Sequence, residues 1–257
     1  MTALLVHKRL DDPIAYRNGS IITVAQYLAD VQFCADKLPD AEYLLLACQD
    51  RYAFAGGFGA ALKRGQISLL PSTHTEELIA QLSDTYENTY CLTDEADCSI
   101  KLPQTNITKW LLQAQPLTEL AIPHFPIEQV AALVFTSGST GLPVAHKKTW
   151  GKLIINVQSE GKRLGVVPGS GYTIIGTVPP QHMYGFESTV LIAMQNACAF
   201  ESSKPFYPAD IEHVVSNTPR PRALITTPFH LRALLTELES PARVDLLVSA
   251  TAPLAVS

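Results

Sequence analysis

Short apolar runs alternate with longer segments of helical periodicity along most of the chain. After Thr23, apolar residues recur at every third or fourth position up to Cys34, which predicts a helix capped by that threonine. Buried strands are predicted at 43–48, 67–70, 89–93, 130–135, 172–178, 197–200, 223–226 and 245–248. Further helices are predicted at 52–63 (closed by Gly65), 75–84, 149–164, 184–196, 208–216 and 228–239. The strands are continuously apolar, which is typical of parallel strands covered on both faces.

Strands that alternate with helices predict an α/β fold of crossover units, with two lobes of mainly parallel sheet flanked by helices. Residues 94–126 contain four prolines and break this rhythm, so we expect a peripheral linker there, with a short helix at 110–113. The predicted organisation is a first α/β lobe at 1–93, the linker at 94–126, and a second lobe at 127–257. The last residues run out of a core strand into a turn, so we expect the second lobe to be incomplete and the chain to be the front part of a longer protein.

Composition and charge narrow the class of protein. Hydrophobic residues make up 47% of the 257 residues, and the net charge is −5, which argues against nucleic acid or an anionic membrane as a partner. No apolar run approaches the roughly 18 residues that span a bilayer, and no secretory signal opens the chain. The cysteines are odd in number and scattered, which predicts buried thiols in a reducing cytoplasm: Cys34, Cys48, Cys91, Cys98 and Cys198.

The chemistry is concentrated in a run of small residues that directly follows the strand predicted at 130–135. Such a run can turn successive backbone N–H groups toward one anion, and its hydroxyl groups add donors. An ordinary Ser/Gly surface loop is the alternative. Neither a Walker loop nor a hydrolase elbow fits the spacing of Gly138 and Gly141. We therefore predict that these residues bind phosphate: Thr136, Ser137, Gly138, Ser139, Thr140 and Gly141.

Residues Thr136 to Pro143 resemble the phosphate-binding signature of the adenylate-forming (AMP-binding) superfamily, which includes acyl- and aryl-CoA synthetases, carrier-loading adenylation domains and luciferases. Three further segments resemble this family in the right order: 179–185, 225–235 and 247–254. The resemblance covers roughly residues 130–254, whereas residues 1–93 share only the rhythm of elements. It implies a truncated N-terminal domain, with the ribose-binding aspartate and the catalytic lysine of the family lying beyond Ser257.

The resemblance also implies roles for single residues. It places His182, Tyr184 and Gly185 beside the substrate carboxylate, and Ser249, Ala250 and Thr251 beside adenine. A structural histidine and ordinary core packing are the alternatives for the histidine and the tyrosine, and a plain turn is the alternative for the adenine segment.

One position departs from the family, which usually has lysine after the loop proline where this chain has Val144. Lys147 and Lys148 can supply the positive charge of that lysine to a phosphate from a position further along the chain, or they form an exposed basic pair.

The function implied is that of an ATP-dependent, AMP-forming acid:thiol ligase. A small carboxylic acid is activated with ATP and Mg²⁺ to an acyl-adenylate, and coenzyme A or the phosphopantetheine of an acyl carrier protein then takes the acyl group. Magnesium would arrive with ATP, with Thr140 as a protein group within its reach, because the histidines show no ligand spacing. We expect this chain alone to be inactive. The alternatives are a non-catalytic nucleotide- or acyl-binding module whose phosphate loop is degenerate at Val144, and a purely structural α/β subunit.

Overall fold

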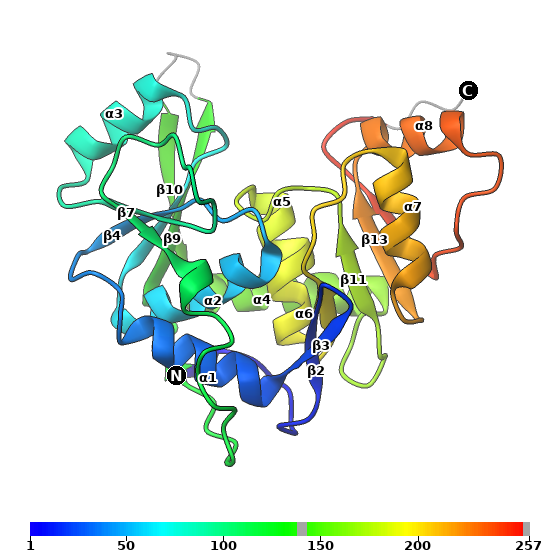
Figure 1. Ribbon diagram of the computed structural model, residues 1–257, viewed down its shortest axis with the longest axis horizontal. Helices are drawn as coiled ribbons and strands as arrows, with labels where there is room; N and C mark the ends of the chain where they lie inside the picture. The colour runs from blue at the N-terminus through cyan, green and yellow to red at the C-terminus, as the bar shows by residue number, and fades with distance from the viewer. Residues whose placement is uncertain (138–142, 254–257) are drawn as a thin grey trace.

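The strands of residues 1–137 and 143–253, which the computed structural model describes, form two six-stranded sheets and one short pair (Figure 1). The first sheet has the order β10 (Pro143–Thr149), β9 (Val130–Ser137), β5 (Ile67–Leu70), β4 (Tyr43–Leu46), β6 (Tyr90–Thr93) and β7 (Gln104–Asn106). The second has the order β14 (Leu246–Ser249), β13 (Arg222–Thr226), β11 (Thr173–Gly176), β12 (Ala199–Glu201), β2 (Pro13–Arg17) and β3 (Ser20–Thr23). The short pair is β1 (Thr2–Ala3) with β8 (His124–Phe125).

Each sheet is parallel except for one edge strand: β10 runs antiparallel to β9 in the first sheet, and β3 runs antiparallel to β2 in the second. The predicted α/β class with mainly parallel sheets is therefore confirmed. The α-helices of the described residues are α1 (Val24–Ala35), α2 (Arg51–Arg64), α3 (Glu76–Thr85), α4 (Trp150–Leu164), α5 (Met183–Gly185), α6 (Ile192–Gln195), α7 (Pro208–Asn217) and α8 (Pro228–Glu237). A 3-10 turn, η1 (Ile107–Lys109), and a π-helical segment, η2 (Phe186–Leu191), complete the elements.

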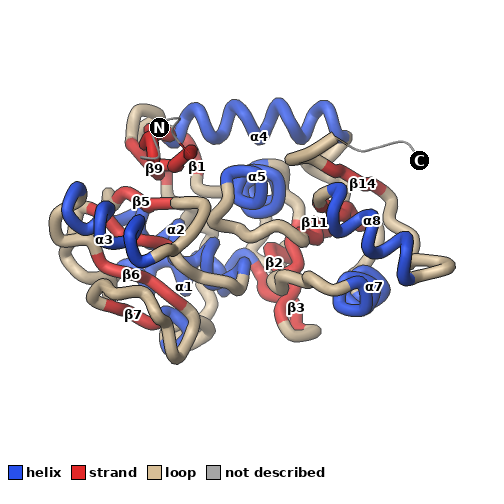
Figure 2. The backbone as a smooth tube through the Cα atoms, turned by 90° about the horizontal axis from the view of Figure 1, so that it is seen from above, coloured by secondary structure: helices blue, strands red, loops and turns tan. Residues whose placement is uncertain are grey.

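The largest apolar core lies between the two sheets and is filled by side chains from α1, α2, α4, η2 and α6. In Figure 1, α3 lies on the outer side of the first sheet, while α7 and α8 lie on the outer side of the second; each side has its own smaller core. Figure 2 shows α4 extending along one side of the molecule between the two lobes. Successive residues of β4 point into different cores, Leu44 and Leu46 into the central one and Leu45 into the outer one, which explains the continuous apolar run.

Local signals start and stop the helices as the sequence predicts. The Thr23 hydroxyl accepts a hydrogen bond from the Gln26 amide (3.3 Å), so this threonine caps α1. Gly65 ends α2 in the left-handed conformation (φ 71°), where a residue without a Cβ carries little strain. None of the helices in the described ranges combines the length and apolar character needed to cross a bilayer.

Strand pairing crosses the expected segment boundaries. β9 and β10, from the range 127–257, complete the first sheet, whereas β2 and β3, from the range 1–93, complete the second. The proline-rich range 94–126 adds β7, which pairs in parallel with β6. Apolar patterns reveal a strand but carry no information about its neighbour, because any strand offers the same backbone donors and acceptors.

Two predicted helices differ from the structure. The range 110–113 is not helical: Leu112 adopts a φ of 61°, and its amide donates to the buried carboxylate of Asp30 (3.0 Å) instead of to a preceding turn. The range 184–196 is helical but widens at η2, where the Ile192 amide donates to the carbonyl of Glu187, five residues back.

Candidate functional site

A cleft of about 440 Å³ lies where the carboxyl ends of strands from both sheets face each other. In α/β proteins this edge of the sheet is where ligands bind. The cleft is lined by residues in the second half of β9 and by residues that end or follow β5, β11, β13 and β14: Leu70, Ser72, Val134, Phe135, Val178, Pro179, Gln181, His182, Met183, Tyr184, Thr227 and Thr251. The wall is mostly apolar, with a few polar groups, as in sites for small organic ligands.

A second cavity, of about 490 Å³, lies at the opposite, amino-terminal ends of β11 and β12. It is lined in part by His7 and Cys198, and the His7 ring is bonded to the Cys198 carbonyl (3.2 Å). Burial lowers the pKa of His7. The carboxyl-end cleft is the candidate site because it contains residues from the sequence motifs.

The strand that precedes the predicted phosphate loop, β9, contributes to this cleft. Thr136 and Ser137 end β9 and pair with Val144 and Pro143. The preceding residue, Phe135, lines the cleft. The other predicted phosphate-binding residues lie outside the described residues: Gly138, Ser139, Thr140 and Gly141. β9 therefore reaches the edge of the sheet at which the cleft opens.

Lys147 and Lys148 lie further along β10, opposite Leu133 and Ala132 in the middle of β9. Because a strand rises about 3.4 Å per residue, Lys147 lies about 10 Å along the strand from Val144. Neither lysine is among the described residues that line the cleft. Lys148 instead interacts electrostatically with Glu187. Burial raises the pKa of Glu187, and the charge of Lys148 offsets part of that rise.

His182 reaches the cleft from a compact segment after β11. It precedes α5, its carbonyl accepts from the Phe186 amide (2.8 Å), and its own amide donates to the Pro179 carbonyl (3.2 Å). Gly185 permits this closure: a Cβ there would lie 2.0 Å from the Pro179 carbonyl oxygen. Burial, and secondarily Lys204, lower the pKa of His182, and burial together with His182 lowers the pKa of His74. His182 is thus a mainly neutral imidazole in the cleft wall.

Tyr184 also lines the cleft, but its hydroxyl is engaged elsewhere. Its single proton is shared between the main-chain carbonyls of Thr226 (3.2 Å) and Val248 (3.3 Å), which lie at the carboxyl ends of β13 and β14. Burial raises the pKa of Tyr184 to about 12, so the phenol stays protonated. The ring can therefore offer an apolar face while its hydroxyl holds two strands together.

The predicted adenine segment ends β14. Ser249 pairs with Thr226, and the Ala250 amide donates to the Thr226 carbonyl (3.3 Å). Thr251 adopts a φ of 82° and lines the cleft, whereas Ser249 and Ala250 are not among its lining residues. The buried Ser249 hydroxyl has no partner within the described residues. The structure thus brings Thr251 into one cleft with His182 and Tyr184.

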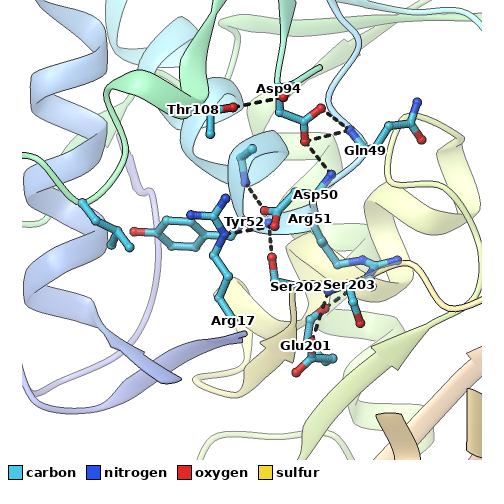
Figure 3. A network of polar contacts seen from close by, with 12 residues as sticks. Arg17, Gln49, Asp50, Arg51, Tyr52, Asp94, Thr108, Glu201, Ser202 and Ser203 are labelled. Atoms are coloured by element: carbon cyan, nitrogen blue, oxygen red, sulfur yellow. Dashed lines mark hydrogen bonds and ion pairs between the residues drawn. The ribbon is translucent and has the colours of Figure 1, made fainter. Parts of the chain in front are cut away.

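Arg51 is the functional candidate that the sequence analysis missed. It begins α2, is fully buried, and lies in the polar network shown in Figure 3. The Asp94 carboxylate fixes the start of this helix by accepting from the amides of Gln49 (2.9 Å) and Asp50 (2.7 Å). Burial lowers the pKa of Arg51 to about 10, which leaves it charged at neutral pH. The available signal was a charged residue directly before an apolar run, Arg51-Tyr52-Ala53-Phe54.

Comparison with known proteins finds similarity in sequence to a CoA ligase and in fold to a CoA synthetase. No protein-family model matches the chain. Over 108 residues, the chain is 33% identical to a 4-coumarate–CoA ligase of Rhodobacter capsulatus, a match covering 42% of this chain and 27% of that ligase.

Two solved structures share the fold over nearly the whole chain. The o-succinylbenzoate CoA synthetase MenE of Bacillus subtilis, in complex with AMP, has a TM-score of 0.77 at 17% identity, over 95% of this chain and 65% of that one. ATP-bound MatB of Rhodopseudomonas palustris has a TM-score of 0.75 at 18% identity, over 96% and 54%. The chain therefore spans less than two thirds of these proteins.

The chain therefore has the α/β fold of the CoA synthetase MenE and of MatB. The resemblance to the adenylate-forming superfamily, indicated by the motifs, is confirmed. The match to the R. capsulatus ligase shows similarity in sequence over part of the chain, and the matches to MenE and MatB show a shared fold.

Proposed function

We propose that the protein is an AMP-forming acid:thiol ligase that activates a carboxylic acid with ATP. The observation that carries the proposal is the cleft, which His182 and Thr251 line together with Phe135 of β9, the strand that precedes the predicted phosphate loop. The relatives support it: one is a 4-coumarate–CoA ligase, and MenE has been solved with the acyl-adenylate OSB-AMP and with ATP and magnesium.

In the proposed reaction, a carboxylate oxygen of the acid attacks the α-phosphorus of ATP, and the bond to pyrophosphate breaks. A thiol sulfur then attacks the acyl carbon, AMP leaves with the bonding electron pair, and a thioester forms. The thiol is that of coenzyme A or of phosphopantetheine on an acyl carrier protein. Negative charge grows on the departing pyrophosphate, so fixed N–H donors and Mg²⁺ at the phosphates lower the barrier.

Each motif residue has a proposed role in binding ATP or the acid. Thr136 to Gly141 would hold the β- and γ-phosphates, and Thr140 would be a protein group for the Mg²⁺ that arrives with ATP. His182, neutral and half-buried, donates a hydrogen bond to the acid carboxylate, and the ring of Tyr184 packs against the acyl chain. Gly185 shapes this segment, and Ser249, Ala250 and Thr251 pass beside adenine. Lys147 and Lys148 remain the proposed source of the charge that Val144 lacks.

Two further parts of the proposal concern the whole protein. We propose a cytoplasmic location, which the five free cysteines support. We also propose that residues 1–257 alone do not complete the reaction, because the segments of the family that supply its ribose-binding aspartate and catalytic lysine have no counterpart in them.

The test is acid-dependent exchange of labelled pyrophosphate into ATP, measured with the full-length gene product over a panel of aliphatic and aryl acids. His182→Ala should lower the exchange rate about 100-fold, since a misplaced reactant typically costs that much. His213→Ala is the matched control, because His213 is exposed on α7 and, among the described residues, its ring forms a hydrogen bond only with Asn217 of its own helix.

Three results bear on the assignment. Exchange that requires an acid and falls only in the His182 variant supports the ligase. ATP binding without exchange with any acid would replace it with the non-catalytic binding module. Absence of ATP binding would leave a structural α/β subunit.

A further inference from the structure

Every donor of the Arg51 guanidinium is already used. Nε donates to the Thr189 hydroxyl (2.8 Å), and Nη1 donates to the carbonyls of Glu201 (3.1 Å) and Ser203 (2.6 Å). Nη2 donates to the carbonyls of Gly176 (3.2 Å) and Val178 (2.9 Å). An arginine has five N–H donors, so none is left for a ligand. Arg51 therefore acts on the cleft only through the chain segments that it holds.

Two of these bonds fix the segment that carries His182. The segment begins after Val178, whose carbonyl accepts from Arg51 Nη2. It closes at Gly185, whose carbonyl accepts from the Thr189 hydroxyl, and that hydroxyl in turn accepts from Arg51 Nε. Between these two points the chain supplies five residues of the cleft wall: Pro179, Gln181, His182, Met183 and Tyr184.

The close fit around Arg51 depends on a glycine. A Cβ at Gly176 would lie 2.6 Å from Arg51 Nη2 and 2.7 Å from Thr189 Cγ2. Only glycine at the end of β11 allows the guanidinium to reach both the strand and the threonine.

We propose that Arg51 is the positioning residue of the cleft: from the start of α2 it holds the segment containing His182 at both ends, directly at Val178 and through Thr189 at Gly185. The arginine belongs to a helix of the first 93 residues, whereas the segment follows β11 of the second sheet. The bonds thus make the geometry of the cleft depend on the contact between the two lobes. The inference does not need the proposed ligase activity, because its test reads His182 itself.

The test compares Thr189→Val with Thr189→Ser. Valine keeps the shape of threonine but breaks the relay from Arg51 to Gly185, while serine keeps the hydroxyl. The pKa of His182 is measured by NMR titration of histidine-labelled protein without ligand. The charged and titratable groups that act on His182 are Lys204, after β12, and His74, after β5. In the native protein the pKa lies below its ordinary value of about 6.5 because the ring is buried.

We expect Thr189→Val to raise the pKa of His182 by about 0.5 toward the ordinary value, because a loosened segment exposes the ring. Thr189→Ser should retain the native pKa. Arg51→Lys should act in the same direction and more strongly, because lysine supplies three donors for five acceptors. Combining Arg51→Lys with Thr189→Val should add little to Arg51→Lys alone, since the two residues belong to one relay.

Tyr52→Phe is the control, because it removes the bond from the Tyr52 hydroxyl to Asp30 (2.7 Å) next to Arg51 without touching the segment. It should lower stability and leave the His182 titration unchanged. An unchanged titration in Thr189→Val, or an equal change in Tyr52→Phe, would overturn the proposal. If Arg51→Lys does not fold, the comparison of Thr189→Val with Thr189→Ser still tests the proposal. Because no ligand is present, a failure of the ligase proposal would not affect this result.

Discussion

Gly185→Ala isolates one steric contact at the base of the cleft. Gly185 has φ −65° and ψ −41°, which any residue adopts readily. The new methyl group, however, would lie 2.0 Å from the Pro179 carbonyl oxygen and 2.8 Å from its carbon. These are backbone atoms, so the clash cannot be relieved by a side-chain rotation. Either α5 or the Pro179 peptide must move by more than about 1 Å to restore ordinary contact.

The expected cost follows from two opposing effects. Inserting a methyl group into a packed interior costs about 3 kcal/mol at the upper end of the usual range, which suits a clash with rigid backbone. Replacing glycine by alanine in a helical conformation recovers about 1 kcal/mol. The net loss in unfolding free energy is about 2 kcal/mol, which lowers Tm by roughly 4 to 8 °C in a domain of this size.

Urea denaturation and thermal unfolding measure this loss, with Gly56→Ala in α2 as the matched control. A Cβ at Gly56 meets only the Leu111 Cδ2 atom, at 3.3 Å, and the end of that side chain can move. We expect this control to change stability by less than about 1 kcal/mol. The reasoning fails if the Gly185 variant is as stable as the Gly56 variant, since the only difference invoked is contact with backbone.

Three further outcomes are expected. Cys98 is the one half-buried cysteine in the described residues, so a thiol reagent should label about one cysteine quickly in the native protein. Cys98→Ser should abolish this rapid labelling. Rapid labelling of several thiols would contradict the burial of the other four. Arg220 and the Arg222 amide lower the pKa of Asp245 to about 2, below the unfolded value of about 3.9. The ionised Asp245 therefore stabilises the folded state above pH ~4, and this contribution is lost as the pH falls toward 2. The urea midpoints of wild type and Asp245→Asn should converge on acidification. A difference in midpoint that stays constant with pH would refute the lowered pKa of Asp245. Val144→Lys should tighten ATP binding about fivefold by calorimetry, in line with about 1 kcal/mol for a partly exposed charge pair; unchanged affinity would argue against phosphate contact near β10.

The cleft was only partly predictable. His182, Tyr184 and Thr251 come from motifs that directly follow buried strands, and parallel strands bring their carboxyl ends to one edge of a sheet. Arg51 gave no comparable signal, because four of its five acceptors are main-chain carbonyls, which every residue possesses. The position of Lys147 along the sheet depends on the register of β10 against β9, which the sequence pattern does not reveal.

The sequence by itself determined most of the helices and the central strands: long apolar runs became strands, most periodic segments became helices, and Thr23 and Gly65 set helix ends, because these signals act within a few residues. Only the tertiary structure decided that β9 joins the first sheet, that β2 joins the second, and that Arg51 ties the two lobes at the cleft. The physical reason is that apolar burial has no direction and backbone hydrogen bonds are the same for every residue. Partners distant in sequence are selected only when the whole chain packs.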